Sequence, residues 1–477
     1  MAVRWISLLL LCLFRLESSY QDQCVLYWTT LTCDGSKLNL TTFPSLDLCE
    51  EYRTLSIINT NLTDLQSGKI VLPQCSRLVS LDLSFNGIRI LNTSIVRSNP
   101  AIEMLKLVGN KLRSVPKDIL AGTLFLEYID LSRNLIETIE EFSFHQNKYL
   151  QYLNVKDNRI YTIYGNAFSG LESLHYLHLS NNFITEFPFR DSGYNFSHLR
   201  EMSLRNNNIS RLSTSTDRYV CESIDLAQNL LQSVDDFALV GFPDTSLRLA
   251  HNFISRLETF IFGKSPHNLT ALGLPFNLLT EIPTSLLRQL PKLVNLNLGN
   301  NRLTRIPKEA FTSNRYLMTI TLRNNYIHEV HPMALVGLHR LTALNLRNNK
   351  LTTLPAELFD PSVQFLIQLF GNNWTCDCEV YPILEWLQKS QYFVDDIKCG
   401  TTLHENTSFL LEFPFEEICS GIEEEHVVTT LTTGLLTTDV IDTEAQFDET
   451  DIPNGRQEGV QLTPFMLPLL LLFISSM

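Results

Sequence analysis

Leucine and asparagine recur along most of the chain in one fixed order of apolar and polar positions. The run from Leu341 to Leu351 shows the unit, which reads L-x-x-L-x-L-x-x-N-x-L with its asparagine at position 9. Thirteen such asparagines follow one another at intervals of 22 to 25 residues. They are Asn86, Asn110, Asn134, Asn158, Asn182, Asn207, Asn229, Asn252, Asn277, Asn301, Asn325, Asn349 and Asn372. A period in this range is typical of a solenoid, whose coils must stack because one repeat cannot bury its own apolar face.

Positions 4 and 6 of each unit are apolar and alternate with polar neighbours, which predicts a short strand with one buried face. Fourteen such strands would form a long parallel sheet on the inner side of an arc. The buried position-9 amide is expected to bond to backbone groups of its own and the adjacent coil, because an unsatisfied buried polar group costs about 1–3 kcal/mol. The fourteen units begin at Tyr52, Leu78, Ile102, Leu126, Leu150, Leu174, Leu199, Cys221, Asp244, Leu269, Leu293, Leu317, Leu341 and Gln364.

The repeat is uneven between Leu199 and Asp244. The stretch Ser213–Asp217 replaces the usual apolar outer segment with small polar residues, and Asp244 stands where leucine is usual. Because an unpaired buried carboxylate is costly, we expect a local bend or a loosened coil at this place.

The repeated unit resembles the leucine-rich repeat family over roughly residues 52–420. The resemblance implies an α/β solenoid, a horseshoe with a concave parallel β-sheet and disulfide-bonded N- and C-terminal caps. In its layout the chain resembles lipid-anchored adhesion proteins of the chaoptin and connectin type, the variable lymphocyte receptors and the ectodomains of Toll-like receptors. These resemblances imply recognition at the cell surface.

The N-terminus has the pattern of a secretory signal, which we assign to residues 1–19. Arg4 precedes the apolar run 5–14, and Ser18 and Ser19 are small residues suited to cleavage. Eight N-x-Ser/Thr acceptors agree with the secretory pathway. They are Asn39, Asn61, Asn92, Asn195, Asn208, Asn268, Asn373 and Asn406. The net charge of −14 argues against a nucleic-acid ligand.

Nine of the ten cysteines remain once Cys12 leaves with the signal. In the N-terminal cap, residues 20–51, Cys24 and Cys33 are placed to close a short hairpin. Cys49 and Cys75 each stand three residues before successive repeats, and neighbouring strands are ~4.8 Å apart, close to the Cα separation that a disulfide needs. We therefore pair them. Cys221 is left at a core position 1, where a free thiol behaves as a small apolar group.

The repeats at residues 52–375 are followed by a cysteine-rich segment at 376–420. It resembles the C-terminal cap of extracellular leucine-rich repeat proteins, and the resemblance implies the pairs Cys376–Cys399 and Cys378–Cys419. A zinc site is the alternative, which C-x-C spacing without a nearby histidine pattern disfavours.

The C-terminal residues change composition abruptly. Residues 421–454 are acidic and rich in threonine, which predicts an extended stalk without a core. Residues 465–474 form an apolar run too short for a membrane-spanning helix. We therefore expect a GPI attachment signal at 455–477 with Asn454 as the attachment site, and a single-pass helix is the alternative.

Neither a catalytic motif nor a cofactor or metal motif stands out, so we predict a binding protein rather than an enzyme. Positions 2, 3, 5, 7 and 8 form the concave face, and position 3 is tyrosine in three consecutive repeats. A tyrosine row is typical of interface hot spots, although cross-strand packing alone also explains it. The predicted ligand-binding residues are Tyr128, Tyr152, Tyr176, Arg133, Lys156, His178, Arg200 and Arg205.

The sequence thus favours a cell-surface recognition module, an adhesion protein or a co-receptor. Its partner would be a protein ligand or a cell-surface protein, a second copy of the chain included, with the membrane contacted through a lipid anchor. An innate immune receptor for microbial ligands and a structural protein of the extracellular matrix are the alternatives.

Overall fold

The computed structural model describes residues 24–27, 29–34, 53–60, 77–91, 93, 99–187, 196, 198–212, 221–240, 245–358, 365–375 and 386. All of them belong to the compact unit Met1–Glu412. The signal segment, the stalk and the anchor signal lie outside the described residues, as does the C-terminal cap apart from residue 386. Also outside are Cys49, Cys75, Cys376, Cys378, Cys399, Cys419, Asn39, Asn61, Asn92, Asn195, Asn406 and Asn454.

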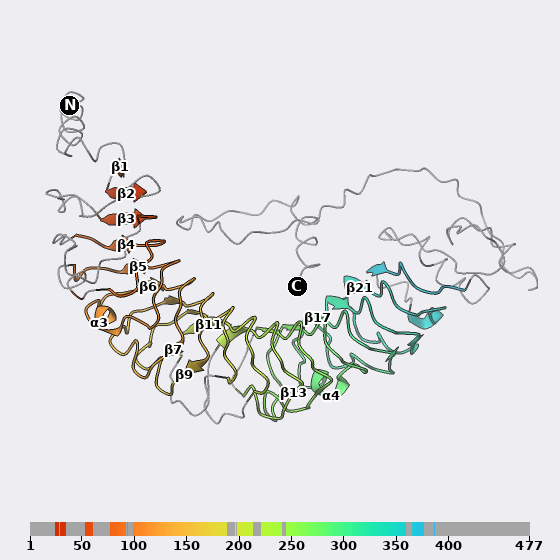
Figure 1. The fold of residues 1–477 in the computed structure, drawn as a ribbon. Coiled ribbons are helices and arrows are strands. Elements are labelled where there is room, and N and C mark those ends of the chain that lie inside the picture. Colours follow the sequence, from red (N-terminus) through yellow and green to blue (C-terminus); the bar gives the residue numbers. More distant parts are fainter. Residues whose placement is uncertain are drawn as a thin grey trace, which may run out of the picture. The chain divides into compact units, whose positions relative to one another are not determined.

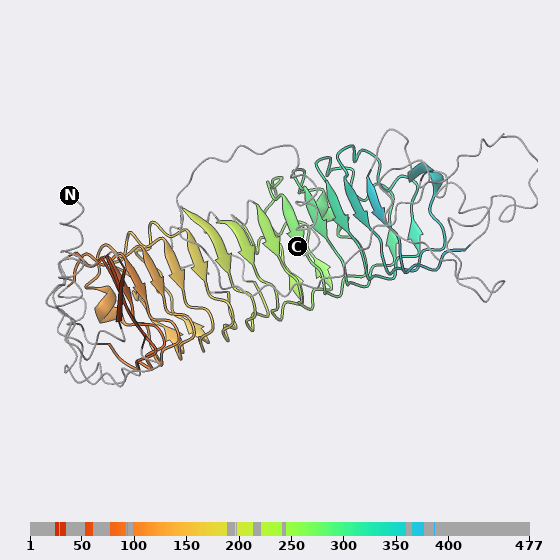
Figure 2. The same cartoon turned by 90° about the horizontal axis from the view of Figure 1, so that it is seen from above.

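A sheet of sixteen strands lines the inner side of the curved stack of coils (Figure 1). Seen from above, its strands lie side by side along the described coils (Figure 2). In order the strands are β1 (Cys24–Tyr27), β2 (Thr30–Asp34), β3 (Thr54–Ile58), β4 (Ser80–Asp82), β5 (Met104–Lys106), β6 (Tyr128–Asp130), β8 (Tyr152–Asn154), β10 (Tyr176–His178), β11 (Leu199–Ser203), β12 (Cys221–Asp225), β14 (Ser246–Arg248), β16 (Ala271–Gly273), β17 (Asn295–Asn297), β19 (Thr319–Thr321), β21 (Ala343–Asn345) and β22 (Leu366–Gln368).

The fourteen strands from β3 onward coincide with the fourteen predicted repeats and pair in parallel, which confirms the expected fold. The sheet is longer than expected because β2 of the N-terminal cap pairs with β3 in parallel, while β1 pairs with β2 antiparallel. Cys24 stands opposite Cys33 in this hairpin, and Cys33 is disulfide-bonded. The bond between these two cysteines stays a prediction.

Burial follows the repeat position closely. In the coil that contains β17, Leu296 at position 4 is 1% exposed, and Leu298 at position 6 is fully buried. Burying a leucine side chain contributes about 1.5–3 kcal/mol, so the stacked leucines supply most of the driving force for coil packing.

The position-9 asparagines form a buried hydrogen-bonded ladder. The Asn325 amide nitrogen donates to the carbonyl oxygens of Leu298 at 3.1 Å and Leu322 at 2.9 Å. Its Oδ1 accepts from the Leu303 N–H at 3.0 Å. The Leu322 oxygen also accepts from Asn349 of the next coil at 3.0 Å, so one carbonyl oxygen bonds to the asparagines of two successive coils. Thr60 takes position 9 in the first repeat and donates from its N–H and its hydroxyl to Asn86 Oδ1.

Position 8 adopts the left-handed backbone conformation in all fourteen repeats, with φ between 53° and 75°. Asparagine tolerates this conformation better than most side chains, and glycine adopts it freely. Asparagine or glycine therefore fills eight of these positions: Asn59, Gly109, Asn181, Asn206, Asn300, Asn324, Asn348 and Gly371.

The outer side of the coils carries short elements among the described residues. They are α3 (Lys117–Leu120), α4 (Thr284–Leu287), the 3-10 helix η3 (Ala356–Leu358) and the paired strands β7 (Thr138–Ile139) with β9 (Thr162–Ile163), β13 (Ser233–Val234) with β15 (Arg256–Leu257), and β18 (Arg305–Ile306) with β20 (Glu329–Val330).

The sheet runs without a break through the uneven repeats. β11 and β12 pair from Leu199 opposite Cys221 to Ser203 opposite Asp225, and β12 continues in register with β14. The predicted loosening is therefore wrong for the sheet side, because the position-4 and position-6 residues there keep the repeat. Ser213–Asp217 and Asp244 lie outside the described residues.

Candidate recognition surface

Three tyrosines on neighbouring strands form a row on the concave face, which we call the tyrosine ladder: Tyr128, Tyr152 and Tyr176. The rings of Tyr128 and Tyr152 stack with centroids 4.5 Å apart and planes 5° apart. The Tyr176 ring lies 6.1 Å from that of Tyr152 and is tilted by 45°. All three side chains are half-buried. The facing sides of the Tyr128 and Tyr152 rings therefore cover each other, whereas the Tyr176 ring is tilted out of this stack.

The carboxylate of Asp130 lies beside the Tyr128 end of the tyrosine ladder. The Tyr128 hydroxyl lies 3.5 Å from Asp130 Oδ2, which also accepts from the Asn154 amide at 3.0 Å. Burial and then the Asp130 charge raise the pKa of Tyr128 well above its usual range, so this phenol stays neutral and can donate. Lys106 Nζ lies 6.0 Å from the Tyr128 ring centroid, at the outer limit of a cation–π contact.

Histidines gather at the other end of the ladder. The His178 ring lies 5.2 Å from Tyr152, and the rings of His175 and His198 stack at 6.1 Å. Within the part of the chain that the structure describes, the buried Nδ1 of His175 has no hydrogen-bond partner. His198 was not among the predicted residues, because it precedes position 1 and so lies outside the strand pattern.

The predicted basic residues are less clustered than the tyrosines. Arg133 pairs with Asp157 of the next coil at 3.7 Å, and Arg205 donates to Gln228 Oε1 at 3.1 Å. Arg200 is exposed within β11 at position 2, whereas Arg205 follows the strand at position 7. The half-buried Lys156 lies at position 7 of the Tyr152 coil. These side chains border the tyrosine ladder along both ends of its strands and do not form one cluster.

Three of the predicted glycan acceptors are described, and all three are exposed: Asn208, Asn268 and Asn373. Asn208 and Asn373 stand at position 10, past the strand, and Asn268 precedes position 1. None of the three occupies a concave position. Sugar on these residues would be attached outside the strand positions that carry the tyrosine ladder.

Cys221 is a buried free cysteine. Its Sγ lies 3.1 Å from the Ser223 carbonyl oxygen and 3.8 Å from that of Arg200. Burial raises the pKa of the thiol to about 12, so Cys221 acts as a core residue.

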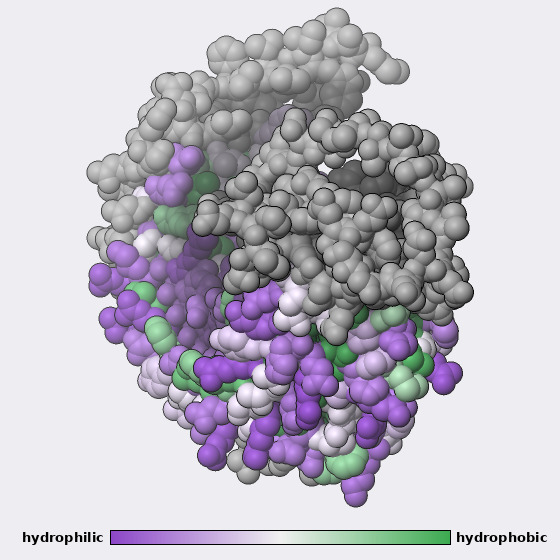
Figure 3. All heavy atoms as spheres, turned by 90° about the vertical axis from the view of Figure 1, so that its right-hand side faces the viewer, coloured by the Kyte–Doolittle hydropathy of each residue, from purple (hydrophilic) through white to green (hydrophobic). Residues whose placement is uncertain are grey.

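Elsewhere in the described ranges, no three His, Cys, Asp or Glu side chains are grouped to hold a metal ion. No helix among those same residues is long and apolar enough to cross a membrane. Viewed from the C-terminal side, the coloured surface is mostly hydrophilic with scattered apolar residues (Figure 3).

These features define a leucine-rich repeat solenoid whose concave sheet carries aromatic and polar side chains. A family model described as leucine rich repeat matches residues 125–184, 267–315, 291–351 and 315–373. The matches support the leucine-rich repeat family for the repeats of this chain.

The chain is similar over part of its length to Tsukushi of Gallus gallus, 31% identical over 130 residues, which are 26% of this chain and 35% of that protein. Osteomodulin of Bos taurus is 35% identical over 147 residues, 29% of this chain and 33% of that protein. The oligodendrocyte-myelin glycoprotein of Homo sapiens is 33% identical over 129 residues, 27% of this chain and 28% of that protein. The chain thus spans about a third of the length of these relatives.

Two solved structures share the fold. TLR13 in its complex with ssRNA13 superposes with a TM-score of 0.55 at 21% identity, over 77% of this chain and 60% of that one. A leucine-rich repeat protein of Leptospira interrogans superposes with a TM-score of 0.51 at 21% identity, over 75% of this chain and 100% of that one. At this identity the likeness shows the fold alone.

Proposed function

We propose that this chain is a cell-surface recognition protein, an adhesion protein or co-receptor, that binds a protein ligand on its concave face through the tyrosine ladder. The observation that carries the proposal is the row of three adjacent tyrosines with polar groups at both ends. Tyrosine buries a large area at low entropic cost, and its hydroxyl supplies a hydrogen bond, so it is enriched where interfaces are strongest. The leucine-rich repeat relatives support a binding role.

The competing explanation is that the tyrosines only stabilise the sheet. A stacked aromatic pair contributes about 0.5–1.5 kcal/mol beyond its buried area, and Tyr152 contacts a tyrosine on each side. Packing predicts a loss of stability when Tyr152 is truncated, whereas recognition predicts a loss of binding that exceeds any loss of folded protein.

The test compares Tyr152→Ala with Tyr161→Ala. Tyr161 belongs to the same coil, lies on its outer side and is 52% exposed, so it is a matched tyrosine outside the ladder. Cells that express the full chain are tested for aggregation with one another and for binding to an array of extracellular proteins. Truncating a hot-spot residue costs about 2 kcal/mol or more, roughly thirtyfold in affinity.

Binding that survives Tyr152→Ala at equal amounts of folded surface protein would exclude the ladder as the recognition site. Equal losses in both variants would likewise exclude it. Melting temperatures of the purified variants separate reduced folding from reduced affinity.

We further propose that the chain is exported and held on the outer membrane leaflet by a GPI anchor. The secretory signal pattern, the N-glycan acceptors and the short apolar C-terminal run support this placement. Phosphatidylinositol-specific phospholipase C is expected to release the protein from cells. Retention of a chain with its C-terminal residues intact would support the spanning-helix alternative instead.

Two other functions remain as alternatives: an innate immune receptor for microbial ligands and a structural matrix protein. Induced expression and binding after microbial challenge would favour the first. Recovery of the chain from the cell-free matrix without an anchor would favour the second.

A further inference from the structure

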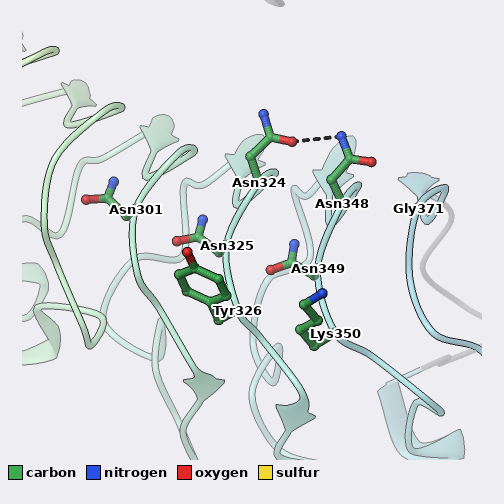
Figure 4. A pocket seen from close by; sticks show the side chains of 8 residues that line it. All are labelled: Asn301, Asn324, Asn325, Tyr326, Asn348, Asn349, Lys350 and Gly371. Carbon is green, nitrogen blue, oxygen red and sulfur yellow. Dashed lines mark hydrogen bonds between the residues drawn. The ribbon is translucent and has the colours of Figure 1, made fainter.

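A second group of side chains lies where two C-terminal coils leave the concave sheet. We call it the basic grid. It consists of positions 7, 8 and 10 of the repeats that contain β19 and β21: Arg323, Asn324, Tyr326, Arg347, Asn348 and Lys350. Figure 4 shows the asparagine pair above, with Tyr326 and Lys350 below it on their respective coils. Four grid residues border a hollow of about 330 Å³, which is lined by Asn301, Asn324, Asn325, Tyr326, Asn348, Asn349, Lys350 and Gly371.

The grid is held in place by its neighbours. Asn348 donates from its amide to Asn324 Oδ1 at 2.7 Å, and Asn324 donates to Asn300 Oδ1 at 2.8 Å (Figure 4 shows the first bond). A Cβ on Gly299 would lie 3.3 Å from the Arg323 Cγ, so the arginine stem packs over this glycine. A pre-arranged side chain loses less entropy when a ligand binds.

The charge of the grid is one-sided. Four successive repeats begin at Leu269, Leu293, Leu317 and Leu341. Positions 2 to 10 of these repeats contain no aspartate or glutamate, although the whole chain carries a net charge of −14. Arg323 and Lys350 are exposed. Among the residues that the structure describes, no carboxylate lies within 4.0 Å of either cation. A local field of one sign therefore faces solvent and favours an anionic ligand.

We propose that the basic grid is a binding site for an anionic polysaccharide, a chain of sulfated or carboxylated sugars. The Arg323 guanidinium can hold a sulfate or carboxylate through two parallel hydrogen bonds, and Lys350 adds a point charge. The Asn324 and Asn348 amides both donate and accept, as sugar hydroxyls require. The Tyr326 ring is 54% exposed and offers an apolar surface for a sugar ring.

A single-stranded nucleic acid is the other polyanion that fits a basic surface. Its recognition rests on several aromatic platforms that stack successive bases. The grid holds one aromatic side chain among cations and amides, a composition that suits hydroxyl-rich sugars better. This ligand class does not depend on the tyrosine ladder, and the two sites lie on different repeats.

The experiment measures binding of the purified glycosylated chain to immobilised heparin, hyaluronan and a polyuridylate RNA. The test variant is Arg323→Ala/Lys350→Ala. The matched control is Arg305→Ala/Arg315→Ala, which removes two exposed arginines of the neighbouring coil outside the grid. All four positions are exposed, so both variants should fold, which melting temperatures verify.

We expect saturable heparin binding that weakens at least tenfold in the grid variant and little in the control. The loss of one hydrogen bond to a charged group corresponds to roughly tenfold or more in affinity. Tyr326→Ala should also weaken binding without changing the charge, and Tyr152→Ala should not affect it. Binding to heparin alone assigns the site to sulfated sugars, whereas equal binding to hyaluronan means that carboxylates suffice.

Three results would overturn the proposal. The first is no saturable binding to either polysaccharide, and the second is an equal loss in the grid and control variants. The third is RNA that displaces heparin and depends on Arg323 and Lys350, which would make the site a nucleic-acid site. Because Asn373 is a glycan acceptor on the following coil, the same contrast between variants must also appear in an Asn373→Gln background.

Discussion

The adjacent asparagines Asn324 and Asn325 allow one substitution to be compared with its own neighbour. Both lie in one turn, and Figure 4 shows Asn324 in the upper row of asparagines and Asn325 in the lower row. Asn325 is 5% exposed, and its side chain bonds to four backbone groups of its own and the preceding coil, of which the bond to the Arg323 oxygen is the longest at 3.2 Å. The Asn324 side chain bonds to the side chains of Asn300 and Asn348, and its backbone N–H bonds to the Arg347 oxygen, a bond that the substitution keeps. We predict that Asn325→Ala destabilises the solenoid far more than Asn324→Gly.

The magnitude follows from which groups lose their partners. In Asn325→Ala the Leu303 N–H loses its acceptor, and an unsatisfied buried group costs about 1–3 kcal/mol. The Leu298 and Leu322 oxygens keep a bond from Asn301 and Asn349, so each loses one of two bonds, worth about 0.5–1.5 kcal/mol. The expected loss is about 2–6 kcal/mol. Glycine at position 324 keeps the left-handed backbone available, and a surface substitution usually stays within about 0.5 kcal/mol.

Urea denaturation followed by circular dichroism measures both variants and the parent chain. Because a solenoid can unfold in parts, the slope of the transition is compared as well as its midpoint. Similar midpoints for Asn325→Ala and Asn324→Gly would show that the buried bonds contribute little. A large loss of stability in Asn324→Gly alone would mean that the side-chain bonds among Asn300, Asn324 and Asn348 hold the coils together.

Three further predictions follow from particular contacts. Burial raises the pKa of Cys221 from its ordinary 9.0 to about 12, so iodoacetamide at pH 8 should label this thiol only after unfolding, and labelling of the native protein would contradict this. The stability that the buried neutral thiol contributes is present below pH 9 and is lost as the pH rises towards 12. Gly371→Ala should destabilise by more than about 1 kcal/mol, because φ is +75° and the new Cβ would lie 2.0 Å from Asn348 Oδ1; an unchanged melting temperature would contradict this. Heparin should leave the effect of Tyr152→Ala on protein binding unchanged, since changes at well-separated sites add within about 0.5 kcal/mol, and heparin-dependent protein binding would show that the two sites are coupled.

The repeat spacing was sufficient to predict every strand of the fourteen repeats and the buried asparagine ladder. A residue that recurs at a fixed position shows its role through its neighbours in other coils. Asn147 and Asn314 lacked that signal because they lie in the outer segments of distant repeats. Each nevertheless donates to two backbone carbonyl oxygens of the preceding coil. Asn147 donates to Leu120 and Thr123 at 3.0 and 2.9 Å, and Asn314 donates to Leu287 and Leu290.

The candidate site was less predictable, because side-chain direction matters more there than strand position. Spacing was sufficient to predict that Tyr128, Tyr152 and Tyr176 occupy equivalent positions on neighbouring strands. It did not predict the close stacking that half-buries the rings, so truncation of Tyr152 should cost more stability than a residue on an open face would. The pairing of Arg133 with Asp157 also depends on side-chain reach that no repeat pattern specifies.

Positions 8 and 9, which form the turn after each strand, have different roles. Position 9 joins adjacent coils from inside, because its amide bonds to backbone groups of its own and the preceding coil, as Asn325 shows. Position 8 holds a left-handed backbone in every repeat, and its residue is exposed or half-buried. It can therefore become an arginine, an aspartate or an asparagine without loss of the core, as Arg133, Asp157 and Asn181 show in successive coils. A ligand that spans several coils meets side chains at a spacing set by the buried ladder, so surface composition can change while the geometry of recognition stays constant.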